Sequence, residues 1–257
     1  MPRFSRIVPA LAAACALTAG PVLAQRAAPL RTGDDLVRAM HARYAGQWYH
    51  TLSFTQATSR VMADSVHVEM WREWALVPGA LRIDMGDPAA HNGALFKGDS
   101  LFVIQGGRVA RRVARRNPLM VLGFDVYGQS PERSLQVLHE EGFNTALLRE
   151  DTFEGRPVYV VGAAAGDLHS KQFWVDRERL LFVRLLEPLQ NDTTKTSDIR
   201  FLAYKRYGGG WVSERVEMYN DGKRFLWEDY TDVKVNEALP ATLFDPDHWA
   251  DVPASAP

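Results

Sequence analysis

Histidine is the side chain in this sequence best suited to bind a metal ion or to transfer protons near neutral pH. Seven histidines are spread along the chain, at His41, His50, His67, His91, His139, His169 and His248. None of them forms the H-E-x-x-H or H-x-H spacing that brings two imidazoles to one metal ion. We therefore interpret the histidines as surface or structural residues, and we predict neither a metal site nor a cofactor.

Motifs for nucleophilic catalysis and phosphate binding are also incomplete. Glu132 stands where the G-x-S-x-G elbow around Ser130 requires a glycine, and residues 208–210 (GGG) lack the following Lys and Ser or Thr of a phosphate-binding loop. We predict that the protein is not an enzyme. Catalysis by scattered carboxylates such as Asp176 and Asp229 is the hypothesis that the sequence supports least.

A cluster of arginines could recognise anions, because the planar guanidinium group suits phosphate and carboxylate. Five of them fall within nine residues, at Arg108, Arg111, Arg112, Arg115 and Arg116. One interpretation is a basic lip that contacts anionic lipid headgroups or an acidic partner. The other is a solvated edge strand whose charge prevents aggregation.

An apolar cluster directly after the arginines could cover a hydrophobic ligand. It contains Leu119, Met120, Val121, Leu122 and Phe124, and its methionine offers an adaptable surface. From the predicted strands we add Trp71, Trp74, Leu81, Ile83, Phe102, Phe173, Val175 and Phe201 as candidate cavity residues. Trp71 and Trp74 have opposite parity in a regular strand, so at most one of them faces the cavity. Ordinary core packing is the alternative for the whole cluster.

The first 24 residues have the pattern of a secretory signal peptide. Arg3 and Arg6 precede an apolar run, and small residues end at Ala24. Lipid attachment at Cys15, the only cysteine, is a less favoured alternative, because Ala12 stands where lipoprotein signals prefer leucine. We therefore predict an exported protein with a signal peptide at 1–24, a linker at 25–31, one domain at 32–249 and a tail at 250–257.

The elements that must position these residues are mostly strands. From 171 to 235, segments rich in Val, Phe, Tyr and Trp alternate with turns at 176–177, 207–210 and 220–222, which predicts an antiparallel meander. Further strands are expected at 49–59, 65–77, 80–85, 92–97, 101–105, 144–149 and 157–162. One helix is expected to start at Thr32 or Asp34, and another at Ser130. The formal net charge of −1 over 257 residues argues against a nucleic-acid binder.

Taken in order, several short motifs resemble the LolA-like periplasmic lipoprotein carriers. They are residues 53–56 (SFTQ), 77–82 (VPGALR), 98–102 (GDSLF), 117–120 (NPLM) and 173–177 (FWVDR), followed by Asn236, 239–240 (LP) and 243–246 (LFDP). The resemblance covers nearly all of the chain after residue 24.

This resemblance implies a mainly β, strongly curved antiparallel sheet that forms a half-open barrel, with helices over its concave face. It also implies a monomeric, non-enzymatic carrier of acylated lipoprotein or phospholipid, served by an inner-membrane release complex and an outer-membrane acceptor. Val77 stands where the carriers have an arginine that holds the lid closed. The alternative is an envelope sensor or adaptor that uses the same fold to bind a protein partner or a misplaced lipid.

Overall fold

A single antiparallel sheet of thirteen strands dominates the computed structural model, which describes residues 29–251. The predicted signal peptide and Cys15 lie outside the described residues. The strands are β1 (Thr51–Met62), β2 (Ser65–Leu76), β3 (Ala80–Met85), β4 (Gly93–Lys97), β5 (Ser100–Gln105), β6 (Arg108–Ala114), β7 (Leu148–Phe153), β8 (Arg156–Val161), β9 (Gln172–Asp176), β10 (Phe182–Leu189), β11 (Asp192–Tyr207), β12 (Gly210–Asn220) and β13 (Lys223–Val235).

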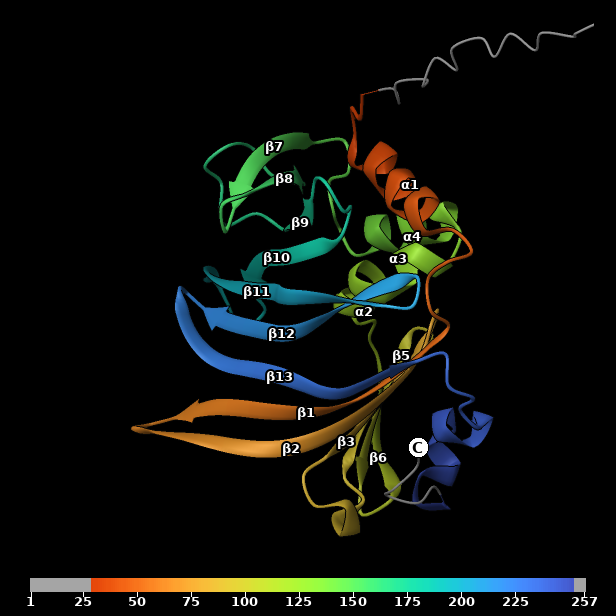
Figure 1. Ribbon diagram of the computed structural model, residues 1–257. Coiled ribbons are helices and arrows are strands. Elements are labelled where there is room, and N and C mark those ends of the chain that lie inside the picture. The colour runs from red at the N-terminus through yellow and green to blue at the C-terminus, as the bar shows by residue number, and fades with distance from the viewer. Residues whose placement is uncertain (1–28, 252–257) are drawn as a thin grey trace, which may run out of the picture.

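Two meanders meet in the middle of this sheet. The strand order is β6-β5-β4-β3-β2-β1-β13-β12-β11-β10-β9-β8-β7, so the first and last strands pair with each other and β6 and β7 form the two edges. Figure 1 shows the resulting curved sheet, which does not close on itself. The predicted fold class, a mainly β half-open barrel, is confirmed.

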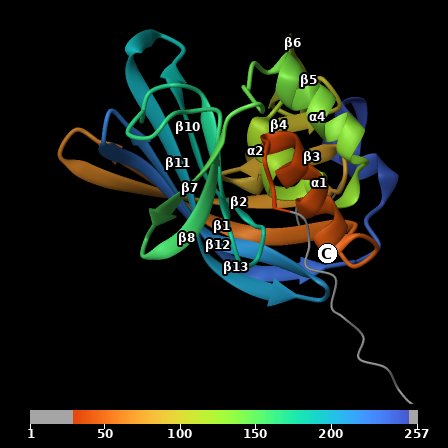
Figure 2. The ribbon, with the colours of Figure 1, turned by 90° about the horizontal axis from the view of Figure 1, so that it is seen from above.

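The helices lie inside the curve of the sheet, as the view from above shows (Figure 2). They are α1 (Gly33–Tyr44), α2 (Pro118–Met120), the π-helical turn η2 (Val121–Asp125), α3 (Val126–Gly128) and α4 (Pro131–Glu140). Leu36, Met40 and Tyr44 of α1 are buried there, at the spacing that predicted one apolar helix face. The sheet and these helices together enclose the main hydrophobic core.

Local sequence explains where these helices begin. The hydroxyl of Thr32 accepts a hydrogen bond from the Asp35 amide, and the Asp35 carboxylate accepts one from the Thr32 amide, which completes a capping box. The Ser130 hydroxyl caps α4 by accepting a hydrogen bond from the Arg133 amide, and Pro131 occupies the first turn of this helix. Both predicted helix starts are confirmed.

One predicted strand is misplaced. Residues 144–149 were expected to be extended, but β7 begins only at Leu148. The Asn144 side chain accepts a hydrogen bond from the Ala146 amide, and the Thr145 carbonyl accepts one from the Gly33 amide at 2.7 Å. This stretch therefore serves as a turn that secures the start of α1, and the strand follows it.

The convex face carries its own cover. The 3-10 helices η3 (Ala241–Phe244) and η4 (Pro246–Asp251) bury Leu243, Phe244 and Trp249 against β2–β5. The buried Arg82 guanidinium lies 3.8 Å from the centroid of the Trp249 ring and donates to the carbonyls of Leu243 and Trp249. The C-terminal segment is thus fastened to the outside of the sheet.

Candidate functional site

A continuous helical stretch, residues 118–128, crosses the concave face and is called the lid below. Asn117 caps it by accepting a hydrogen bond from the Leu119 amide, and Pro118 occupies its first turn. Its centre is the π-helical turn η2, a local form that is frequent at functional sites. Gly123 packs closely against the Phe201 side chain of β11, because a β-carbon at this position would lie 3.3 Å from the Phe201 ring.

A cavity of about 130 Å³ lies between the lid and the centre of the sheet. It brings together seven of the residues predicted from the sequence to line a cavity, which are Trp71, Leu81, Ile83, Leu119, Met120, Phe124 and Phe201. Phe54, Glu73, Asn117, Val216, Met218, Glu228 and Tyr230 complete its wall. Trp71 lies on this concave side and Trp74 does not. The residues of β2 that share the parity of Trp71, including Glu73, therefore face the concave side.

Two predicted cavity residues need correction. Trp74 and Phe102 lie on the convex face, in the cluster beneath the C-terminal helices. The sequence could not show this, because the C-terminal segment makes that face of β2–β5 apolar as well. Leu122, Phe173 and Val175 belong to the main core but do not line the cavity.

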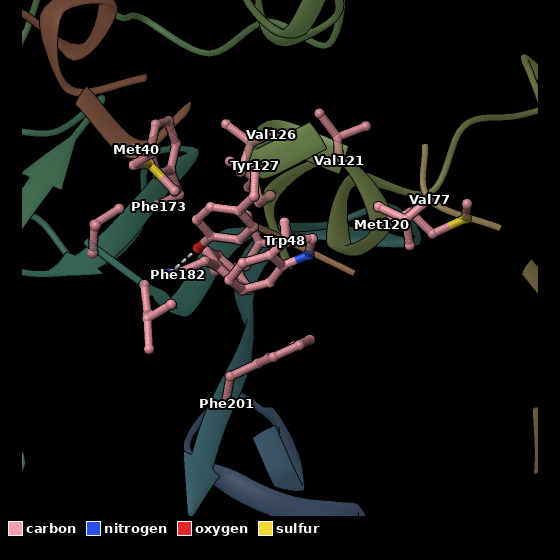
Figure 3. Close-up of a cluster of buried hydrophobic side chains, with 14 of the residues drawn as sticks. Met40, Trp48, Val77, Met120, Val121, Val126, Tyr127, Phe173, Phe182 and Phe201 are labelled. Atoms are coloured by element: carbon pink, nitrogen blue, oxygen red, sulfur yellow. Dashed lines mark hydrogen bonds between the residues drawn. The ribbon is translucent and has the colours of Figure 1, made fainter. Parts of the chain in front are cut away.

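The C-terminal half of the lid is held by Tyr127. This side chain is buried, stacks on Trp48 with ring centroids 4.0 Å apart, and accepts a hydrogen bond from the Phe182 amide at 2.9 Å (Figure 3). The lid therefore joins the turn after α1 to strand β10.

The middle of the lid is held at Asp125. Its buried carboxylate accepts a hydrogen bond from the Gly79 amide at 3.2 Å, in the turn between β2 and β3. Burial raises the pKa of Asp125 to about 7, although this hydrogen bond lowers it. Val77, two residues before Gly79, is buried in the same hydrophobic cluster as Met120 (Figure 3). Packing and one polar contact thus hold the lid at this point.

Four polar side chains of the concave face were not singled out from the sequence. Glu73 and Glu228 are buried in the cavity wall, and Tyr230 donates its hydroxyl to Glu228 Oε2 at 3.0 Å. Gln56 is fully buried and pairs in register with both Trp71 and Tyr230. Its Nε2 donates to Thr58 Oγ1, but its Oε1 has no hydrogen-bond partner.

Burial dominates the titration of the two glutamates. It raises the pKa of Glu228 to about 7, against hydrogen bonds from Tyr230 and Gln56 that lower it. It also raises the pKa of Glu73 well above its usual value, and the charge of Glu228 adds to this effect. Both carboxyl groups of the cavity wall therefore keep their protons to a higher pH than an exposed glutamate does.

The predicted basic lip runs along the edge strand β6 and the residues after it, and its arginines differ. Arg116 bonds to Asp99 through two nitrogens and lies 2.7 Å from Glu140, while Arg112 lies over the Phe102 ring. Arg108, Arg111 and Arg115 make no ion pair within residues 29–251. Arg115 and Lys171 line a second cavity of about 280 Å³, which shares Asn117 and Leu119 with the first.

Comparisons of the sequence with known protein families and with curated proteins find no match. Solved structures do match. A LolA superfamily protein from Nitrosomonas europaea aligns over 81% of this chain and 96% of its own, with 14% identity and a TM-score of 0.51. An outer membrane lipoprotein-sorting protein domain from Vibrio parahaemolyticus aligns over 85% and 98%, with 14% identity and a TM-score of 0.56. The chain therefore has a LolA-like fold.

Proposed function

From this LolA-like fold we propose that the protein is a carrier that binds acyl chains non-covalently in the cavity beneath the lid. One observation supports the proposal most directly. An apolar cavity lies between a curved sheet and a short helical lid, and Leu119, Met120 and Phe124 of the lid form one side of it. Binding of an alkyl chain contributes about 0.8 kcal/mol per buried methylene, so this site needs no reactive group.

The size of the cavity implies that the lid moves. Sites for drug-sized ligands usually enclose about 300 to 1,000 Å³, whereas this cavity holds about 130 Å³. The second cavity, which shares Asn117 and Leu119 with it, gives a chain a route past the lid. We propose that the lid shifts away from Phe201 as a chain enters and that the structure represents the closed form.

The proposed setting is the periplasm, and the proposed cargo is an acylated lipoprotein or a phospholipid on its way to the outer membrane. The neighbour from Vibrio parahaemolyticus is described as a lipoprotein-sorting domain, which supports this assignment. Arg115 and Lys171 lie beside the second cavity, where they can contact an anionic headgroup. None of the helices within residues 29–251 is long and apolar enough to cross a membrane.

Binding of a fluorescent fatty-acyl probe to lid variants tests this proposal. Phe124→Asp is expected to weaken binding by more than tenfold, because it places a charge in the cavity, whereas Phe124→Leu is expected to keep most of it. Val68→Asp is the matched control, since Val68 is exposed on the convex side of β2. Leu122→Asp is unsuitable, because Leu122 is fully buried in the core and the variant is expected to unfold.

Two outcomes contradict the proposal. If the wild-type chain takes up no probe, the carrier function fails and the sensor or adaptor alternative replaces it. If Phe124→Asp and Val68→Asp both bind as the wild type does, the acyl chain lies elsewhere. Native mass spectrometry of the protein purified from an envelope fraction then identifies any cargo at one copy per chain.

A further inference from the structure

The wall of the lid cavity combines aromatic rings with two buried carboxyl groups. Phe54 and Tyr230 stack with centroids 4.1 Å apart, and Trp71, Phe124 and Phe201 add further rings. Glu73 and Glu228 line the same cavity. A site made only to hold an alkyl chain has no use for two buried acids, each of which costs free energy when it is desolvated.

Glu73 is the clearest sign of a missing partner. It is 6% exposed, it lines the cavity, and its carboxyl group makes no hydrogen bond or ion pair within residues 29–251. Every other acid on the concave or convex face that is buried to a similar degree has a partner side chain or amide, such as Arg184 for Asp198 and Gly79 for Asp125. The carboxyl group of Glu73 is therefore available to a ligand that enters the cavity.

Gln56 provides a second, independent sign. This residue carries no charge and is 0% exposed, and its Oε1 accepts no hydrogen bond. Buried polar atoms in folded proteins nearly always have partners, so this orphan acceptor on the concave face indicates a donor that is absent from the free protein. Gln56 lies between Trp71 and Tyr230 in the register, next to the glutamates on the same face.

The Tyr230 hydroxyl and the Trp71 indole, two hydrogen-bond donors of the cavity wall, already have acceptors. The Tyr230 hydroxyl donates to Glu228, and the Trp71 indole donates to Glu69 at 2.5 Å. The ionisable residues that line the cavity are Glu73 on β2 and Glu228 and Tyr230 on β13, and no lining residue from the lid or from β1, β3, β11 or β12 is cationic. The site thus offers several acceptors and no positive charge of its own.

We propose that the cargo of this cavity is an amphiphile with a protonated amine beside its apolar chain, and that Glu73 and Glu228 hold the ammonium group. An ammonium group brings three N–H donors and a positive charge, which match the orphan acceptors and the two acids. The surrounding rings favour the same cation through their negative faces. A fatty-acid carboxylate brings no such donors and is repelled when either glutamate is ionised. This inference rests on the proposed carrier function and narrows its substrate class.

Proton release follows from this arrangement. Burial raises the pKa of Glu228 to about 7 and that of Glu73 well above its usual value, so in the free protein both carboxyl groups hold protons to a higher pH than exposed glutamates do. The bound ammonium favours ionised carboxylates, so a proton leaves for solvent as the amine enters. An alkyl amine stays protonated below about pH 10, as lysine does, and its affinity should therefore rise with pH in this range.

The test compares decylamine, decanol and decanoate as competitors of the fluorescent acyl probe, below their micellar concentrations. With the wild-type protein at pH 7.5 we expect decylamine to bind about tenfold or more tighter than decanol, and decanoate to bind weakest. From pH 5.5 to 7.5 the affinity for decylamine should rise by up to about tenfold per pH unit, while that for decanol stays constant.

The double variant Glu73→Gln/Glu228→Gln should lose the preference for the amine and keep the affinity for decanol. Both changes preserve side-chain size and remove groups that are costly to bury, so the variant is expected to fold, and its thermal unfolding checks this. Glu178→Gln, at an exposed position, is the matched control. Equal affinity for the amine and the alcohol, or an unchanged preference in the double variant, overturns the amine assignment but leaves the carrier proposal intact. If no decyl compound binds, both proposals fail.

Discussion

Buried carboxylates on the two faces of the sheet have opposite surroundings. On the convex face, Asp198 accepts two hydrogen bonds from Arg184 at 2.8 Å each, and Arg200 adds two more. On the concave face, Glu73 has no partner and Glu228 has only neutral ones. The comparison shows that burial alone does not decide the charge of an acid, because the partner within hydrogen-bond reach does.

The titration of the two groups follows this difference. Burial raises the pKa of Asp198, but the hydrogen bonds from Arg184 and Arg200 outweigh it and leave the pKa below its usual value. Glu228 has no such cation, and its pKa rises to about 7. The convex acid therefore supports the fold, while the concave acids cost stability, which is the expected pattern where a site is prepared for a ligand.

The largest effect is expected when the convex network loses its acid. Asp198→Asn leaves Arg184 and Arg200 without their counter-charge in a poorly hydrated position, and removing one partner of a buried ion pair typically costs about 3 to 5 kcal/mol. The equivalent isosteric change on the other face, Glu73→Gln, should cost nothing at pH 7. Urea unfolding of both variants measures the difference. Equal destabilisation would show that the two faces do not differ as described.

The acids on the two faces should also differ in how their contribution to the free energy of unfolding changes with pH. The pKa of Glu228 is raised on folding, from 4.5 to about 7, so the stability it contributes is complete below pH 4.5 and is lost as the pH rises through 7. Glu228→Gln removes this loss. We therefore expect the variant to match the wild type at pH 4.5 and to exceed it by about 3 kcal/mol at pH 8.

Urea midpoints between pH 4.5 and 8 test this prediction. Asp198 should behave in the opposite way, because its pKa is lowered on folding and its contribution is lost only in acid. If the free energy of unfolding of Glu228→Gln and of the wild type fall in parallel with rising pH, Glu228 is not the group responsible.

A buried carboxyl group should also make the opening of the lid depend on pH, with a smaller effect. Asp125 is buried against the Gly79 amide, and burial raises its pKa to about 7, so ionisation between pH 5 and 8 favours an open lid. We expect the free energy of lid opening to fall by about 2.5 kcal/mol over this range. Hydrogen exchange of residues 118–128, corrected for intrinsic rates, measures it. Asp125→Asn should remove the pH dependence; if the dependence persists, another group controls the lid.

Much of the fold could be predicted from the sequence because its signals are local. The cap at Thr32, the Pro at the start of the lid and the turn at 220–222 each specify their own geometry. The strand faces were harder to assign. Both faces of β2–β5 are apolar, one beneath the lid and one beneath η3 and η4. The alternation of apolar and polar residues therefore does not show which of Trp71 and Trp74 faces the lid.

The polar part of the candidate site could not be predicted for a related reason. Around Glu73, the sequence reads 69–74 (EMWREW), with charges on both parities, which is usual for a strand that is half exposed to solvent. Glu73 and Glu228 are far apart in the chain and line the same cavity only because β1 pairs with both β2 and β13. Their burial depends on the lid, a tertiary contact with no local signal.

The smallest effect concerns the arginines of the edge strand. Arg116 bonds to Asp99 and lies near Glu140, whereas Arg108 and Arg111 are exposed and make no ion pair within the part of the chain that the structure describes. Arg108→Ser/Arg111→Ser should change the free energy of unfolding by less than about 0.5 kcal/mol per site. Arg116→Ser should cost about 1 kcal/mol, because a partly buried network of charges is lost.

The same double variant separates the two interpretations of the basic cluster. If the arginines protect the edge of β6 from pairing with other chains, their removal should increase self-association at high protein concentration, as light scattering measures, and leave vesicle binding unchanged. If they form a basic lip, the variant should instead lose binding to vesicles rich in anionic phospholipid, and the binding of the wild type should weaken with salt. In the first case the arginines of β6 keep the edge of the sheet from pairing with other chains, and in the second they contribute to ligand binding.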